Sequence, residues 1–112
     1  MSGSATRHFI AQRISATMLV VLGLWFALSM HKLDSMQHVV VLGFLATPWH
    51  SVMLGLLCVT LAFHSYLGVQ VVIEDYVHAP RVKWLSLVLS RAVHLVIGIL
   101  CVYKVYEIGF GA

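Results

Sequence analysis

The stretch ISATMLVVLGLWFALSM, residues 14–30, carries no charged side chain and lies between Arg13 and Lys32. Together with its flanks it provides the roughly 20 apolar residues that an α-helix needs to cross the hydrocarbon core of a membrane. Its apolar run is longer than the core of a cleavable signal peptide, and no small-residue cleavage site follows it. We therefore interpret residues 14–31 as a membrane-spanning helix.

The composition of the whole chain supports a membrane protein. Of its 112 residues, 61% are hydrophobic and 10% are charged, and the net charge is +3. A soluble domain has about 45–50% apolar and about 25% charged residues, and a small interior could not hide this apolar excess. These values exclude a soluble enzyme and a disordered chain, and the dispersed basic residues argue against nucleic-acid binding. Two cysteines, Cys58 and Cys101, lie inside apolar runs and give no disulfide framework.

A second uncharged stretch, residues 35–73, is too long for one helix. Pro48 divides it, because proline suits the first turn of a helix and disfavours helix immediately before itself. The second span therefore covers residues 48–73. The preceding piece, up to Ala46, is expected to be a short interfacial segment with Asp34 or Ser35 as a helix cap.

A third span covers about residues 84–106, although Arg91 and His94 lie within it. The chain shows no repeat, no low-complexity tract and no linker that would separate a second domain. The predicted fold is a single all-α integral membrane domain, residues 1–112. It has three transmembrane helices and a short interfacial segment between the first and the second.

The Lys and Arg residues predict the orientation of these helices. One side of the membrane receives Arg7, Arg13, Arg81 and Lys83, and the other receives Lys32 and Lys104. Because basic residues favour the cytoplasmic side, we expect a cytoplasmic N-terminus. About a dozen residues precede the first span, and they contain no organelle transit sequence. The expected location is the cytoplasmic (inner) membrane of a bacterium.

His64 is the polar outlier of the second span, about 14 Å from its cytoplasmic end at 1.5 Å per residue. A neutral imidazole is a good ligand for haem iron, and a helix bundle can enclose the macrocycle. Gly68, one turn later, leaves room on the same face for a flat group. The alternative is a histidine that only forms a hydrogen bond with a neighbouring helix.

Residues 64–78 read HSYLGVQVVIEDYVH. Eleven residues make almost three helical turns, so Asp75 falls within about 20° of the His64 face and about 16 Å along the axis. At that position Tyr76 can offer a phenolic hydrogen-bond donor, with the carboxylate of Asp75 beside it. The alternative is that both residues lie at the membrane interface, where tyrosine is common, without a role in binding.

This segment resembles the haem-ligand and quinone-site stretch of the small membrane anchor of succinate dehydrogenase, respiratory complex II. The shared pattern is a histidine, a glycine four residues later, and an aspartate eleven residues after the histidine, followed by Tyr-Val-His. Residues 70–78 are especially similar to the alphaproteobacterial and mitochondrial branches. Residues 12–16, QRISA, and Trp25 resemble the same family, as do the length and the three-span plan.

The resemblance implies roles for five residues. His64 is expected to be one axial ligand of the iron of haem b, with the other ligand supplied by the partner cytochrome b anchor protein. Arg13 is expected to contact a haem propionate, and Gly68 to face the haem. Tyr76 is expected to donate a hydrogen bond to ubiquinone, and Asp75 to support that site and its proton traffic.

The same resemblance implies partners and an activity. A flavoprotein subunit and an iron–sulfur subunit are expected to dock on the cytoplasmic side and to deliver electrons from succinate to the quinone. The chain alone is expected to catalyse nothing, since it has no flavin site and two cysteines cannot hold an iron–sulfur cluster. Two alternatives stay open: a fumarate reductase anchor, and a non-redox small membrane interaction or assembly protein.

Arg91 and His94 stand three residues apart and therefore share a helix face. If the third span begins at Trp84, His94 lies about 15 Å deep, close to the depth of His64. A haem held by both histidines of one chain is sterically conceivable, but the family plan does not use it. We expect Arg91 and His94 instead to pair with the partner anchor protein or to approach a propionate.

Overall fold

Three long helices and one short helix follow one another along the chain. The computed structural model describes residues 3–111 and contains no strand in that range. The helices are α1 (Gly3–His31), α2 (His38–Leu45), α3 (Pro48–Tyr76) and α4 (Pro80–Phe110). By length and composition α3, α4 and the part of α1 from Ala5 onward can each cross a membrane. The prediction of three membrane helices with a short segment between the first and second is confirmed.

Proline marks two of the helix starts. Pro48 and Pro80 each lie in the first turn of α3 and α4, where the missing N–H costs no intrahelical bond. The predicted cap of the short segment is wrong, because Gln37 in extended conformation precedes α2 and its side chain makes no capping bond. The Ser35 hydroxyl instead accepts a bond from the Gln37 N–H at 3.4 Å, within the loop before α2.

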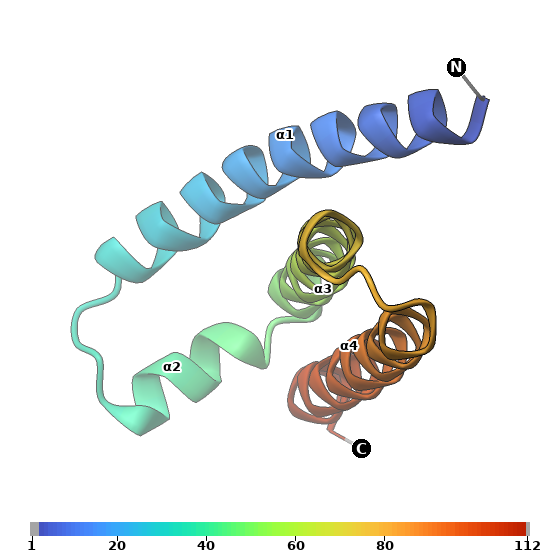
Figure 1. Cartoon of the computed structure of the whole chain (residues 1–112). Coiled ribbons are helices and arrows are strands. Elements are labelled where there is room, and N and C mark those ends of the chain that lie inside the picture. The colour runs from blue at the N-terminus through green and yellow to red at the C-terminus, as the bar shows by residue number, and fades with distance from the viewer. Residues whose placement is uncertain (1–2, 112) are drawn as a thin grey trace.

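The central helix of the arrangement is α3. It packs against α4 along one side and against α1 on another, while the backbones of α1 and α4 stay apart within residues 3–111. Figure 1 shows α3 and α4 running side by side, with α1 crossing them obliquely. The short helix α2 packs against both α3 and α4. The relative rotation of α1 and α3 therefore decides which side chains of these two helices meet.

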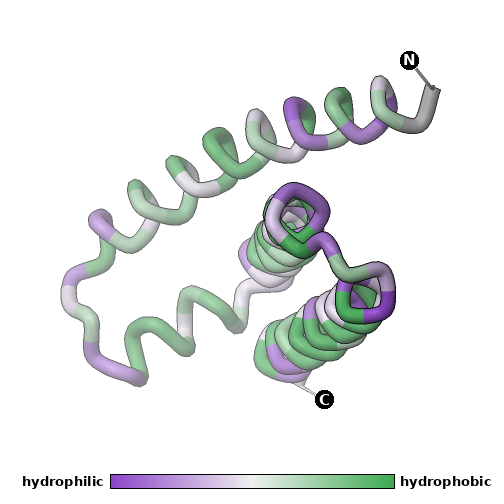
Figure 2. The backbone as a smooth tube through the Cα atoms, viewed as in Figure 1, coloured by the Kyte–Doolittle hydropathy of each residue, from purple (hydrophilic) through white to green (hydrophobic). Residues whose placement is uncertain are grey.

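Most of the apolar surface of this chain faces outward. Within the described residues, the buried hydrophobic side chains are Leu22 and Leu67. Figure 2 shows hydrophobic residues along the long helices and hydrophilic residues gathered near the helix ends and in the connecting loops. Such a surface requires lipid or the helices of other chains around it.

Gly109 and Ser51 form a close contact between α3 and α4. Ser51 is 2% exposed, and its hydroxyl donates to the Leu45 carbonyl at 2.6 Å. A Cβ atom built on Gly109 would collide with the Ser51 side chain. The end of α4 can therefore reach the start of α3 only because residue 109 has no side chain.

We expect Gly109→Ala to separate these helix ends and to lower the free energy of unfolding by about 1–3 kcal/mol, as overpacking does. Thermal unfolding of the detergent-purified complex measures this change. Gly55→Ala on α3 is the matched control, because an added Cβ there meets nothing within 4 Å. Equal unfolding temperatures for both variants would contradict the packing role of Gly109.

Candidate functional site

His64 is half-buried on α3, and its ring is held by α1. The His64 Nδ1 atom lies 2.8 Å from the Ser15 hydroxyl oxygen, and that hydroxyl donates to the Gln12 carbonyl at 3.1 Å. A carbonyl can only accept, so the single hydroxyl proton goes to Gln12 and Ser15 accepts from Nδ1–H. This arrangement leaves the lone pair on Nε2, the nitrogen that points away from Ser15.

Gly68 lies one helical turn after His64, toward the C-terminal end of α3. A Cβ atom built on Gly68 meets no other heavy atom within 4 Å, so the space beside it is open in this chain. At 100° per residue, Gly68 is about 40° around the helix from His64. An unobstructed strip of the α3 surface thus adjoins the histidine.

Asp75 and Tyr76 lie at the C-terminal end of α3. Because α3 continues without a break to Tyr76, the spacing argument for Asp75 holds: it shares the His64 face, about 16 Å farther along the axis. Tyr76 is the last residue of α3 and is 78% exposed. Both side chains are open to a ligand or a partner protein at this end of the bundle.

Arg13 lies apart from these groups. It is exposed, and its guanidinium carbon stands 5.3 Å from the centre of the Phe9 ring. It precedes Ser15 by two residues, which turns it about 200° around α1, away from the face that meets His64. No carboxylate within residues 3–111 forms an ion pair with it.

His94 has both ring nitrogens engaged by its own chain. Its Nδ1–H donates to the Ser90 carbonyl at 2.8 Å, which leaves Nε2 to accept from the Ser65 hydroxyl at 3.1 Å. Ser65 is adjacent to His64, so the two histidines lie at similar depth, as their positions in the sequence predict. His94, however, joins α3 to α4, whereas His64 joins α3 to α1.

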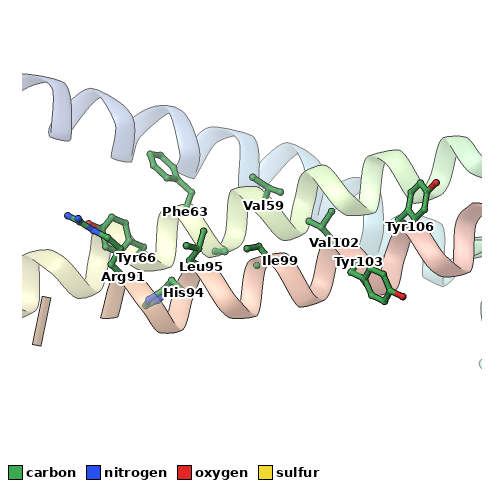
Figure 3. A pocket seen from close by; sticks show the side chains of 12 residues that line it. Val59, Phe63, Tyr66, Arg91, His94, Leu95, Ile99, Val102, Tyr103 and Tyr106 are labelled. Atoms are coloured by element: carbon green, nitrogen blue, oxygen red, sulfur yellow. The ribbon is translucent and has the colours of Figure 1, made fainter. Parts of the chain in front are cut away.

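A groove of about 750 Å³ also lies between α3 and α4. Figure 3 shows Tyr66, Arg91 and His94 at one end of it and Tyr103 and Tyr106 at the other. The remaining lining is apolar: Val59, Ala62, Phe63, Leu95, Gly98, Ile99 and Val102. Arg91 thus faces a hydrophobic groove, with no ion-pair partner in the described part of the chain.

The sequence alone assigns no role to Ser15. The residue is 4% exposed, although it is small, polar and set inside an apolar run. A polar group at membrane depth must find a hydrogen-bond partner, and that requirement was the available signal. The partner itself lies 49 residues away and becomes visible only once the helices are packed.

Comparison with known proteins agrees with the resemblance that residues 64–78 carry. Residues 2–101 match the family described as succinate dehydrogenase/fumarate reductase transmembrane subunit. Three similar proteins carry the name succinate dehydrogenase hydrophobic membrane anchor subunit. That of Rickettsia bellii is 30% identical over 80 residues, which are 71% of this chain and 64% of the relative.

The proteins of Rickettsia prowazekii and Rickettsia typhi are each 29% identical over 83 residues, 73% of this chain and 66% of the relative. The match thus spans slightly less than two thirds of the length of these relatives. The alphaproteobacterial resemblance that residues 70–78 predict is confirmed. This chain therefore belongs to the succinate dehydrogenase/fumarate reductase transmembrane subunit family.

Proposed function

We propose that this chain is the membrane-anchor subunit of a succinate:quinone oxidoreductase, the succinate dehydrogenase of respiratory complex II. It docks the flavoprotein and iron–sulfur subunits to the membrane, and it forms part of the site where ubiquinone is reduced. The three named relatives support succinate oxidation over the fumarate reductase alternative. The chain itself carries out no chemistry without these partners.

The observation that carries the haem assignment is the hydrogen-bond chain from His64 through Ser15 to Gln12. A histidine that ligates a metal donates its other N–H to a fixed acceptor, which sets the tautomer and the ring plane. His64 has this form, with the Nε2 lone pair available for the iron of haem b. The partner cytochrome b anchor protein supplies the second axial ligand. Haem b, when bound, supplies a one-electron redox centre beside the quinone site.

Gly68 and Arg13 also suit a bound haem. Gly68 has open space on the strip next to His64, so a flat macrocycle can lie against the backbone there. Arg13 has an exposed guanidinium without a carboxylate of this chain, and a propionate suits its charge. Because Arg13 lies on the side of α1 away from His64, it would hold a propionate only from that side of the helix.

Asp75 and Tyr76 form this chain's part of the ubiquinone site. The Tyr76 hydroxyl donates a hydrogen bond to a quinone carbonyl oxygen, and the donor gains importance as negative charge builds on that oxygen. Asp75 supports the site and holds or passes a proton near the same oxygen. Both residues are exposed at the end of α3, where the head group can arrive from the bilayer and the soluble subunits can cover it.

The membrane is the bacterial cytoplasmic membrane, with the N-terminus in the cytoplasm. The start of α1 and the end of α3 then lie on the cytoplasmic side, because the spans alternate in direction. This side carries Arg7, Arg13, Arg81 and Lys83, which agrees with the preference of basic residues for the cytoplasmic side. The flavoprotein and iron–sulfur subunits consequently dock where Asp75 and Tyr76 end their helix.

Deleting the gene for this chain tests the anchor function. We expect succinate oxidation with an artificial acceptor to move from the membrane fraction to the soluble fraction, and succinate:quinone reduction to be lost. Expression of the wild-type chain restores both properties. Full succinate:quinone reduction in the membranes of the deletion strain would exclude this function and favour a non-redox membrane protein.

Gly68→Leu tests the open strip beside His64. A Cβ atom at residue 68 meets no atom within 4 Å beyond its chain neighbours and its own helix backbone, so the added side chain starts in open space and extends into the space assigned to haem. We expect the purified complex to lose most of its haem, measured by pyridine haemochrome. Gly55→Leu, also in open space but about 180° around α3 from His64, should keep it. If Gly68→Leu keeps full haem content, the macrocycle does not lie on this strip.

A further inference from the structure

We infer that Ser15 is the positioning residue of the haem site: its hydroxyl holds the His64 ring, fixes the tautomer that can bind iron, and tunes the redox potential of that iron. This role rests on the proposed assignment of His64 as an axial ligand. Neither the family resemblance nor the spacing of the motif assigns a role to this serine. The inference comes from a contact between two helices.

The contact is direct and shielded from water. Ser15 Oγ and His64 Nδ1 are 2.8 Å apart, and Ser15 is 4% exposed. At this depth water cannot replace the serine, so a ring that lost it would keep an unpaired N–H in an apolar surrounding. The hydroxyl therefore restricts rotation of the imidazole and keeps Nε2 directed away from α1.

The direction of the hydrogen bond sets its electronic effect. Ser15 gives its own proton to the Gln12 carbonyl at 3.1 Å and accepts the proton of Nδ1–H. An acceptor on Nδ1–H makes the imidazole a more basic ligand. A more basic ligand stabilises ferric iron more than ferrous iron, so Ser15 lowers the midpoint potential. Its loss should raise that potential.

Thr60 offers a comparison, because its hydroxyl is also buried but does not bond a histidine. Thr60 is equally buried, 5% exposed, and bonds the carbonyl of its own helix, from Thr60 Oγ1 to the Leu56 oxygen at 2.8 Å. It lies one turn before His64 but makes no bond to that ring. Thr60→Val therefore removes a buried hydroxyl about 6 Å from His64 along the α3 axis without touching the ligand, and serves as the matched control.

The experiment uses the complete complex, purified with Ser15→Ala, Ser15→Thr or Thr60→Val in this chain. Alanine suits a helix at least as well as serine, so α1 should form normally. Haem content, the paramagnetic resonance spectrum of the ferric haem and the midpoint potential are measured for each. We expect Ser15→Ala to raise the potential, by up to about 59 mV if the ferric-to-ferrous binding ratio changes about tenfold. Ser15→Thr, which keeps the hydroxyl, and Thr60→Val should match the wild type.

If Ser15→Ala binds no haem, retention of haem by Ser15→Thr and Thr60→Val supports the same role. A wild-type potential and resonance spectrum in a haem-replete Ser15→Ala complex would overturn it. A change in the potential or the spectrum of Ser15→Thr or Thr60→Val as large as that in Ser15→Ala would also overturn it. These results leave the haem assignment intact, whereas absence of haem from the wild-type complex defeats that assignment itself.

Discussion

Replacing Tyr76 by phenylalanine is expected to lower succinate:quinone reduction severalfold or more. The change removes a donor whose hydrogen bond strengthens as negative charge builds on the quinone oxygen. Loss of one such donor costs about 10²–10³ in rate at an enclosed site, and the cost is smaller near the water interface. Phenylalanine keeps the ring, so assembly and haem content should survive.

Two assays on the same membranes separate the possible roles of Tyr76. Succinate oxidation by an artificial acceptor bypasses the quinone and should stay near the wild-type rate. Tyr106→Phe, which alters an exposed tyrosine near the other end of the bundle, should affect neither assay. Unchanged quinone reduction in Tyr76→Phe would make the residue an interfacial anchor. An equal fall in both assays would assign it to assembly.

Replacing His64 by alanine is expected to remove most of the haem from the complex. The iron then lacks one of its two axial protein ligands, which lowers the affinity of the site for haem. Any haem that stays, held by the partner ligand or the propionate contacts, must show an altered absorption spectrum. Imidazole added to the detergent solution can enter the vacated space and should partly restore the wild-type spectrum.

His94→Ala is the matched control for this experiment. His94 lies at similar depth, but its two nitrogens are bonded to Ser90 and Ser65. We therefore expect this variant to keep its haem, which also tests the idea that both histidines of one chain hold the macrocycle. Full haem content with an unchanged spectrum in His64→Ala would disprove the ligand assignment. Loss of haem from His94→Ala, with no loss from His64→Ala, would assign the ligand role to His94 instead.

The sequence predicts the number of helices well because apolar length is a one-dimensional property. Pro48 also locates the start of α3, since proline constrains the backbone locally. The cap of α2 is not predictable in this way. Asp34 and Ser35 are both suitable caps, but the chain stays irregular through Gln37 before the helix begins. Local preference cannot decide among neighbouring polar residues in a connecting loop.

The candidate site is predictable only where it lies on a single helix. The register of Asp75 against His64 follows from their spacing, because α3 is continuous. The pairing of Ser15 with His64 depends on how α1 is rotated against α3. Apolar residues surround both helices, so no hydrophobic stripe in the sequence marks their packed faces. For the same reason, the sequence does not reveal that Arg13 projects away from α3.

The central claim is that this chain contributes a ligand to haem b in a succinate:quinone oxidoreductase. The most direct test is the reduced-minus-oxidised absorption spectrum of the complex purified through a tag on this chain, with succinate as the reductant. We predict a b-type cytochrome spectrum that is weakened or shifted in His64→Ala. A tagged complex that contains the flavoprotein and iron–sulfur subunits but shows no cytochrome spectrum would contradict the claim.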